Sequence, residues 1–131
     1  MEATVVACSP DSVTLSAPLG PNINHRETVF GGSASTLAIL AAWSVLQIRL
    51  LQQNLPFRLV IQRNSMEYLA PIAGTFTAVS VLSEPQAWER QLRMLHRKGA
   101  ARFSVAAELH APSGVAGRFV GEFVALAANA A

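Results

Sequence analysis

Alternation of apolar and polar residues marks the strands of this chain. Ser12–Ala17 places its valine, leucine and alanine side chains on one side and three hydroxyl side chains on the other, which predicts a half-buried strand. Similar patterns predict four more strands, at Phe57–Leu69, Thr75–Leu82, Ala101–His110 and Val115–Leu126. Proline and glycine turns separate these segments, at Pro18–Pro21, Pro71–Gly74 and Pro112–Gly114.

A long apolar run predicts one central helix, from Ser33 to about Gln53. Its large apolar side chains fall on nearly every face, and a helix that is apolar all round is enclosed by protein rather than lying on a surface. Five polar residues interrupt its apolar stretch Ala34–Leu51, including Arg49, so the segment is a poor membrane span. Ser33 directly follows two glycines and is the predicted N-cap.

A second, amphipathic helix is predicted between the third and fourth strands. Ser83–Gln86 has the form of a capping box, with a proline near the first helical position. Trp88, Leu92 and Leu95 then form an apolar stripe at helical spacing, and Gly99 closes the helix.

These elements predict the fold class. An enclosed helix with no polar face needs strands that curl around it, because a half-covered apolar helix would be exposed to water. The pattern therefore favours an α+β hot-dog fold, in which an antiparallel sheet wraps around a long central helix and pairs edge to edge into dimers. No linker or repeat divides the chain, so residues 1–131 are expected to form a single domain.

Composition adds a prediction about assembly. Hydrophobic residues make up 51% of the chain and charged residues only 14%, against about 25% charged in an average soluble protein. Such a chain has more apolar surface than a small domain hides, so we expect a homodimer or homotetramer. The formal net charge of +2 is too small to indicate a nucleic-acid partner.

The titratable residues indicate neither metal nor cofactor. The single cysteine, Cys8, excludes an intramolecular disulfide and is expected to be inert near a frayed terminus. The three histidines lack metal-ligand spacing. Met1–Ser9 has no basic segment followed by a long apolar one, so we expect no signal peptide, no membrane association and a cytoplasmic location.

The polar segment Asn22–Ser33, which opens the central helix, carries the most chemical information. Two glycines let the backbone approach a ligand closely, and a helix N-terminus presents unpaired N–H groups with partial positive charge. Aimed at a thioester carbonyl, these groups would form an oxyanion hole. The alternative is that Gly31 and Gly32 only allow tight packing at the helix start.

The stretch PNINHRETVFGGSASTLAILAAW, with MEYLAPIAGTFTA after it, resembles hot-dog acyl-thioester enzymes. More closely, nearly the whole chain resembles the putative thioesterase family of the YiiD C-terminal type. The resemblance implies that Asn24 hydrogen-bonds the substrate carbonyl or the attacking group, and that the Gly31 N–H completes the oxyanion hole. It also implies an acyl-carrier-protein or acyl-CoA substrate.

The chain departs from the motifs of related enzymes at three positions. Phe30 stands where many have histidine, Glu27 where glycine often precedes the threonine, and Ile39 where hydrolases place an acid in the helix. Hydrolysis normally needs a base or a nucleophile near the carbonyl. The remaining candidates for a base are Glu27, His25 and Glu67, of which Glu67 is expected to be exposed.

The candidate residues fall into two sets. The catalytic candidates are Asn24, Gly31, Gly32 and Ser33. Of these, Ser33 is expected to cap the helix rather than to act as a nucleophile. The substrate-binding candidates are His25, Thr28, Phe30, Asn64, Arg93 and Arg97. Asn64 shares a strand register with Gln62, Val60, Met66 and Tyr68, so Asn64 or Gln62 is expected to point inward. The basic run from Arg90 to Lys98 is either a solvated helix face or a docking site for coenzyme A phosphates or an acidic carrier protein.

Three functions remain open from the sequence. Thioester hydrolysis is the first. Decarboxylation of a malonyl thioester is the second, because it needs stabilisation of an enolate and no base, and the family resemblance extends to malonyl-acyl-carrier-protein decarboxylases. A non-catalytic acyl-binding subunit is the third.

Overall fold

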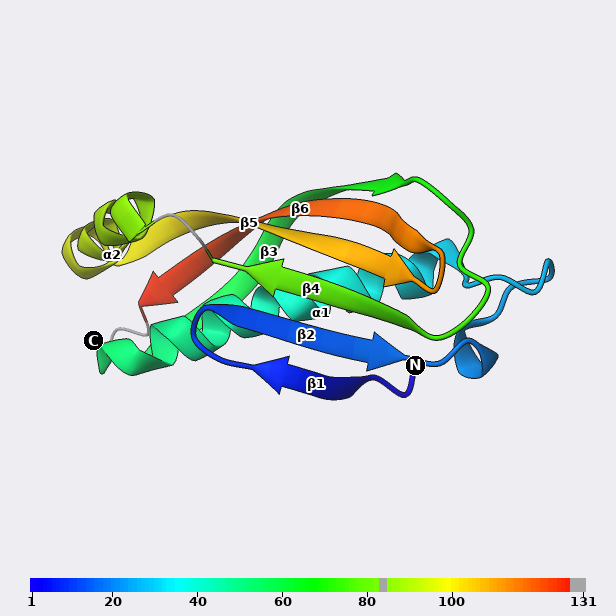
Figure 1. The fold of residues 1–131 in the computed structure, drawn as a ribbon. Helices are drawn as coiled ribbons and strands as arrows, with labels where there is room; N and C mark the ends of the chain where they lie inside the picture. The colour runs from blue at the N-terminus through cyan, green and yellow to red at the C-terminus, as the bar shows by residue number, and fades with distance from the viewer. Residues whose placement is uncertain (83–84, 128–131) are drawn as a thin grey trace.

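A single antiparallel sheet runs the length of the molecule, and the long helix α1 lies along one of its faces (Figure 1). The computed structural model describes residues 1–82 and 85–127. Within these residues the strands pair in the order β1-β2-β4-β5-β6-β3. The elements are β1 (Thr4–Cys8), β2 (Ser12–Ala17), α1 (Gly31–Leu50), β3 (Phe57–Tyr68), β4 (Phe76–Val81), α2 (Pro85–Lys98), β5 (Ala100–Ala111) and β6 (Gly114–Ala127), with short 3-10 helices at Gly20–Asn22 and Leu51–Gln53.

The core lies between α1 and the inner face of the sheet. The buried side of α1 consists of Ala34, Leu37, Ala38, Ala41, Ala42, Val45, Leu46 and Leu50. It packs against the inward-facing residues of the strands, among them Phe76, Phe103 and Phe123. Gly31–Gln53 has the length and composition of a membrane span, but here it packs on the sheet, with 44% of its most apolar window buried. The α+β hot-dog architecture predicted from the sequence is confirmed.

Helix α1 begins two residues before the predicted position. Gly31 is its first residue and Phe30 is the N-cap, without a side-chain capping bond. Ser33 lies inside the first turn, so the prediction that it caps the helix is wrong. The turn closes early because the Phe30 carbonyl accepts the Ser33 N–H at 2.9 Å, while the Phe30 N–H is tied to the Asn22 carbonyl at 2.7 Å.

One side of α1 remains open, although its apolar pattern predicted enclosure on every side. Leu40 is 39% exposed, and Thr36 on the same side is also exposed. The physical reason is that one sheet covers only one side of a helix. The neighbouring edge strand β3 also exposes apolar side chains, including Val60 and Ile61. A long edge strand with exposed apolar residues is a template for pairing with another chain.

Strand β1 is missing from the sequence prediction. All of its residues are exposed, so it gives no alternation signal. Backbone pairing with β2 holds it in place, with Thr4 opposite Ser16 and Cys8 opposite Val13. Cys8 therefore lies at the end of an edge strand, and the expectation of a frayed terminus there is wrong.

A β-bulge in β3 explains why its apolar residues fall in two registers. The pairing with β6 slips between Ile61, opposite Phe123, and Arg63, opposite Glu122. Residues directly opposite each other in a sheet share a face. Ile61 therefore faces inward with Phe123, and after the slip the inward positions become Asn64, Met66 and Tyr68.

Helix α2 packs over the far end of the sheet, near the C-terminal end of α1. Its stripe is confirmed, since Leu92 and Leu95 are buried and the Trp88 ring lies 5.4 Å from that of Phe103. Gly99 closes the helix as predicted, with φ of +76°. The predicted capping box at Ser83–Gln86 includes residues 83–84, which lie outside the described residues.

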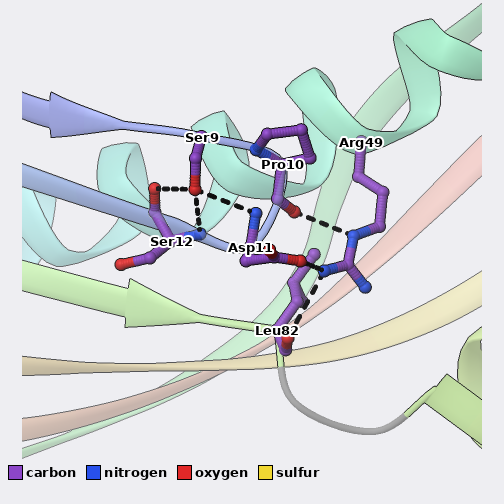
Figure 2. A network of polar contacts seen from close by, with 6 residues as sticks. All are labelled: Ser9, Pro10, Asp11, Ser12, Arg49 and Leu82. Atoms are coloured by element: carbon purple, nitrogen blue, oxygen red, sulfur yellow. Dashed lines mark hydrogen bonds and ion pairs between the residues drawn. The ribbon is translucent and has the colours of Figure 1, made fainter.

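The Arg49 side chain connects α1 to two loop segments at this end of the molecule (Figure 2). Its Nε donates to the Pro10 carbonyl at 2.8 Å, and its Nη2 contacts the Asp11 carboxylate at 2.6 Å and the Leu82 carbonyl at 3.4 Å. One side chain of α1 thus joins the turn between β1 and β2 to the end of β4.

Candidate active site

The loop that leads into α1 is anchored by a buried asparagine. Asn22 is 3% exposed, and its Nδ2 donates to the carbonyls of Pro18 at 2.7 Å and Met1 at 3.0 Å. Both amide hydrogens are therefore satisfied, as burial of a polar group requires. Because the Asn22 carbonyl also accepts the Phe30 N–H, this residue fixes where the helix starts.

Asn24 organises the short hairpin that follows. Its Oδ1 accepts the backbone N–H groups of Arg26 at 2.8 Å and Thr28 at 3.1 Å, and its Nδ2 donates to Thr28 Oγ1 at 2.9 Å. The backbone closes the same loop through the pairing of Ile23 with Val29. An amide nitrogen carries two donors, so the second Asn24 N–H is free of these loop contacts.

Two backbone N–H groups at the start of α1 are open. Ser33 and Ala34 donate to the Phe30 carbonyl at 2.9 and 3.1 Å. Within residues 1–82 and 85–127, the structure holds no hydrogen-bond acceptor for the N–H groups of Gly31 and Gly32. Consecutive unpaired donors at a helix N-terminus favour an anionic oxygen.

An aromatic ring covers each of these glycines. The Phe30 ring lies so close to Gly32 that a Cβ added there would overlap it, and Phe30 is 58% exposed. The Tyr68 ring lies 3.5 Å from the position of a Gly31 Cβ, and its hydroxyl donates to the Gly31 carbonyl at 3.0 Å. Phe30 comes from the loop and Tyr68 from the end of β3, so two separate elements flank the open donors.

A cavity of about 290 Å³ lies beside this helix start. The residues that line it are Val29, Gly31, Ala34, Tyr68, Leu69, Ala70, Pro71, Ile72 and Ala116. None of these side chains is a carboxylate or an imidazole, and Tyr68 supplies the polar group. The arrangement suits an apolar ligand with a carbonyl oxygen directed at Gly31, the glycine that lines the cavity.

Comparison with known proteins decides the family. The family model described as "Putative thioesterase (yiiD_Cterm)" matches residues 1–127. The chain belongs to this putative thioesterase family. No curated protein matches the chain.

Solved structures share the fold of this family member. A protein of unknown function from Chlorobaculum tepidum TLS is 26% identical, with a TM-score of 0.91 over 97% of this chain and 83% of that chain. A putative thioesterase from Shewanella oneidensis is 24% identical, with a TM-score of 0.84 over 96% of this chain and 85% of that chain. A thioesterase from Haemophilus influenzae is 10% identical, with a TM-score of 0.73 over 95% of this chain and 78% of that chain.

In this thioesterase-family protein, most of the predicted site residues come together at the helix start. Asn24, His25, Thr28, Phe30, Gly31, Gly32 and Ser33 all lie in the hairpin or the first turn of α1. His25 is exposed. Glu27 is also exposed and adopts a left-handed φ of 61° in the hairpin. Neither residue lines the cavity.

Three predicted residues lie away from this cluster. Asn64 lies in the register of the inner face, opposite Gly121, but its side chain is exposed, and it precedes Tyr68 by four strand residues, or about 13 Å. Arg93 and Arg97 are exposed on α2, which packs near the C-terminal end of α1, about 30 Å from its first residue. A single chain therefore does not bring these arginines to the glycine donors.

Two residues of the site are absent from the sequence prediction. Asn22 gives no signal, because an asparagine in a polar loop is usually solvated. Tyr68 is the one tyrosine of the chain and lies inside a predicted strand, but its contact with Gly31 spans 37 positions. Glu67 is exposed, as expected, and pairs across the sheet with Arg118.

Proposed function

We propose that this protein hydrolyses acyl thioesters carried by an acyl carrier protein or coenzyme A. The observation that carries the proposal is the pair of unpaired N–H groups at Gly31 and Gly32, of which Gly31 lines an apolar cavity. Membership of the thioesterase family supports the same reaction class.

The proposed reaction uses these donors on the thioester oxygen. Water adds to the carbonyl carbon, the carbonyl oxygen becomes an oxyanion, and the C–S bond breaks to release free acid and thiol. Each well-aligned N–H donor stabilises such a transition state by about 3 kcal/mol. The free amide hydrogen of Asn24 would orient the carbonyl or the attacking water. His25 and Glu27, in the adjacent hairpin, are the candidates for the base.

Decarboxylation of a malonyl thioester is the second candidate. The observation in its favour is the cavity wall, which contains neither a carboxylate nor an imidazole. Loss of carbon dioxide leaves an enolate that the same N–H groups would stabilise, and protonation at carbon then yields the acetyl thioester. This reaction needs no base.

We also propose that the protein acts as a homodimer or homotetramer in the cytoplasm. The exposed side of α1 around Leu40 and the open edge of β3 would be covered by a second copy. Arg93 and Arg97 on α2 would hold the acidic surface of the carrier protein or the phosphates of coenzyme A.

Mass spectrometry of the substrates tests the reaction. Malonyl-, acetyl- and longer acyl-carrier proteins would be incubated with the purified protein and weighed. Free carrier thiol supports hydrolysis, and conversion of malonyl to acetyl carrier supports decarboxylation. Unchanged substrates, with or without saturable binding, would overturn both enzymatic proposals.

A further inference from the structure

We propose that Tyr68 is a positioning residue that aims the Gly32 N–H at the substrate carbonyl. The inference rests on the proposed function for its activity readout. The orientation of the peptide between Gly31 and Gly32 depends on contacts within the chain, whatever the reaction.

The Gly31 carbonyl and the Gly32 N–H are the two ends of one planar peptide unit, and they point in opposite directions. The Tyr68 hydroxyl donates to that carbonyl at 3.0 Å. Holding the oxygen therefore fixes the direction of the N–H at the other end. The donor and the tyrosine act on opposite sides of the same rigid group.

Tyr68 adds a second hold to a peptide that the helix already holds at one point. Helix α1 begins at Gly31, so the Gly31 carbonyl also accepts a backbone N–H from one turn further along. The peptide joins two glycines, which lose more conformational freedom on ordering than any other residues, and the N-cap residue Phe30 makes no side-chain capping bond. An oxyanion donor is effective only when it is oriented before the reaction, and the Tyr68 hydroxyl adds to this order from a different element.

Tyr68 is well placed to be rigid. It is the last residue of β3 and pairs with Gly117 of β6. Its ring lies over Gly31, 3.5 Å from the position that a Cβ would take there. Although the side chain is 57% exposed, it is held at both its backbone and its hydroxyl.

The bulge in β3 decides that Tyr68 performs this role. Without the slip between Ile61 and Arg63, strict alternation would turn Glu67 toward α1 and Tyr68 away from it. A carboxylate facing the open N–H groups would compete with the substrate oxygen for them. The bulge instead leaves Glu67 opposite Arg118, on the outer face.

The test compares Tyr68→Phe, which keeps the ring, with Ser65→Ala, which removes an exposed hydroxyl from the outer face of the same strand. Steady-state hydrolysis of the acyl-carrier substrate gives the activity. Tyr68→Phe is expected to lower kcat by about 10- to 100-fold with unchanged KM and unchanged melting temperature. Ser65→Ala is expected to leave all three unchanged.

Backbone NMR supplies a readout that needs no turnover. The heteronuclear NOE of the Gly32 amide is expected to fall in Tyr68→Phe and to stay unchanged in Ser65→Ala. An unchanged Gly32 amide would overturn the inference, as would a drop in melting temperature that accounts for the lost activity. If the unmodified protein cleaves no thioester, the proposed function fails. The heteronuclear NOE of the Gly32 amide in Tyr68→Phe then tests the role of Tyr68 by itself.

Discussion

The guanidinium carbon of Arg49 lies 5.2 Å from the ring centroid of Trp88. The Arg49 side chain is only 14% exposed, whereas its ionic partner Asp11 is 81% exposed. The stabilising contacts of Arg49 are therefore the partly buried ones, to the Pro10 carbonyl and the tryptophan ring, rather than the exposed ion pair.

Arg49→Met is expected to lower the free energy of unfolding by about 2–5 kcal/mol. It removes a hydrogen bond from a charged donor, worth about 1.5–3 kcal/mol, and the cation–π contact, worth about 0.5–2 kcal/mol. Asp11→Ala is expected to cost less than about 1 kcal/mol, because solvent screens the exposed pair. Urea denaturation measures both. Equal losses in the two variants would show that the ion pair is the dominant contact.

Gly32→Ala is expected to displace the Phe30 ring and lower turnover, whereas Gly31→Ala is expected to leave the fold and the ring unchanged. A Cβ at Gly32 overlaps the ring, but a Cβ at Gly31 meets Tyr68 at an ordinary 3.5 Å. The variant Gly32→Ala combined with Phe30→Ala removes the overlap. Turnover in this double-mutant cycle measures the coupling, and strictly additive effects would contradict the proposed clash.

Asn24→Ala is expected to lower turnover by about 100-fold or more, because it removes a transition-state donor. It also removes the acceptor for the Arg26 and Thr28 N–H groups. Asn24→Asp keeps this acceptor and removes the amide hydrogens, so it separates the two roles. Loss of turnover in Asn24→Asp, with unchanged hairpin amide resonances, supports the role in catalysis. Full turnover in Asn24→Asp would restrict Asn24 to shaping the loop.

Leu40→Glu is expected to shift the protein toward monomers. The substitution places a charge on the exposed side of α1 that a second copy would cover. Val5→Glu is the matched control, because Val5 is exposed on β1, the opposite edge strand of the sheet. Light scattering after size-exclusion chromatography gives the mass. An unchanged mass in Leu40→Glu would exclude this face of α1 as the interface.

Charge reversal at Arg93 and Arg97 is expected to raise KM for the carrier-bound substrate with little change in kcat, since docking is distant from the reacting carbonyl. Arg102→Glu, an exposed change on β5, serves as the control. Steady-state kinetics with the acyl carrier protein measures both parameters. If neither parameter moves in the double variant, the basic face of α2 is a solvated surface.

The sequence predicted most of the elements and their faces, because apolar periodicity records which side of an element is buried. Ser12–Ala17 matches β2 residue for residue, and the hot-dog fold followed from the long apolar helix. Strand β1 was not predicted, because all of its residues are exposed and give no apolar alternation; backbone pairing with β2 holds it in place. The N-cap at Ser33 was wrong because long-range bonds to the loop start the helix at Gly31.

The sequence also determined the chemical character of the site, since the asparagine hairpin and the two glycines are adjacent along the chain. The two apolar registers of the Phe57–Leu69 segment already placed Tyr68 on the inward face and Glu67 on the outward one, and the slip in the pairing with β6 is their physical cause. Only the tertiary structure decided that the inward Tyr68 hydroxyl meets the Gly31 carbonyl, 37 positions away. Such a contact depends on how β3 lies against the start of α1, which no local pattern of residues encodes.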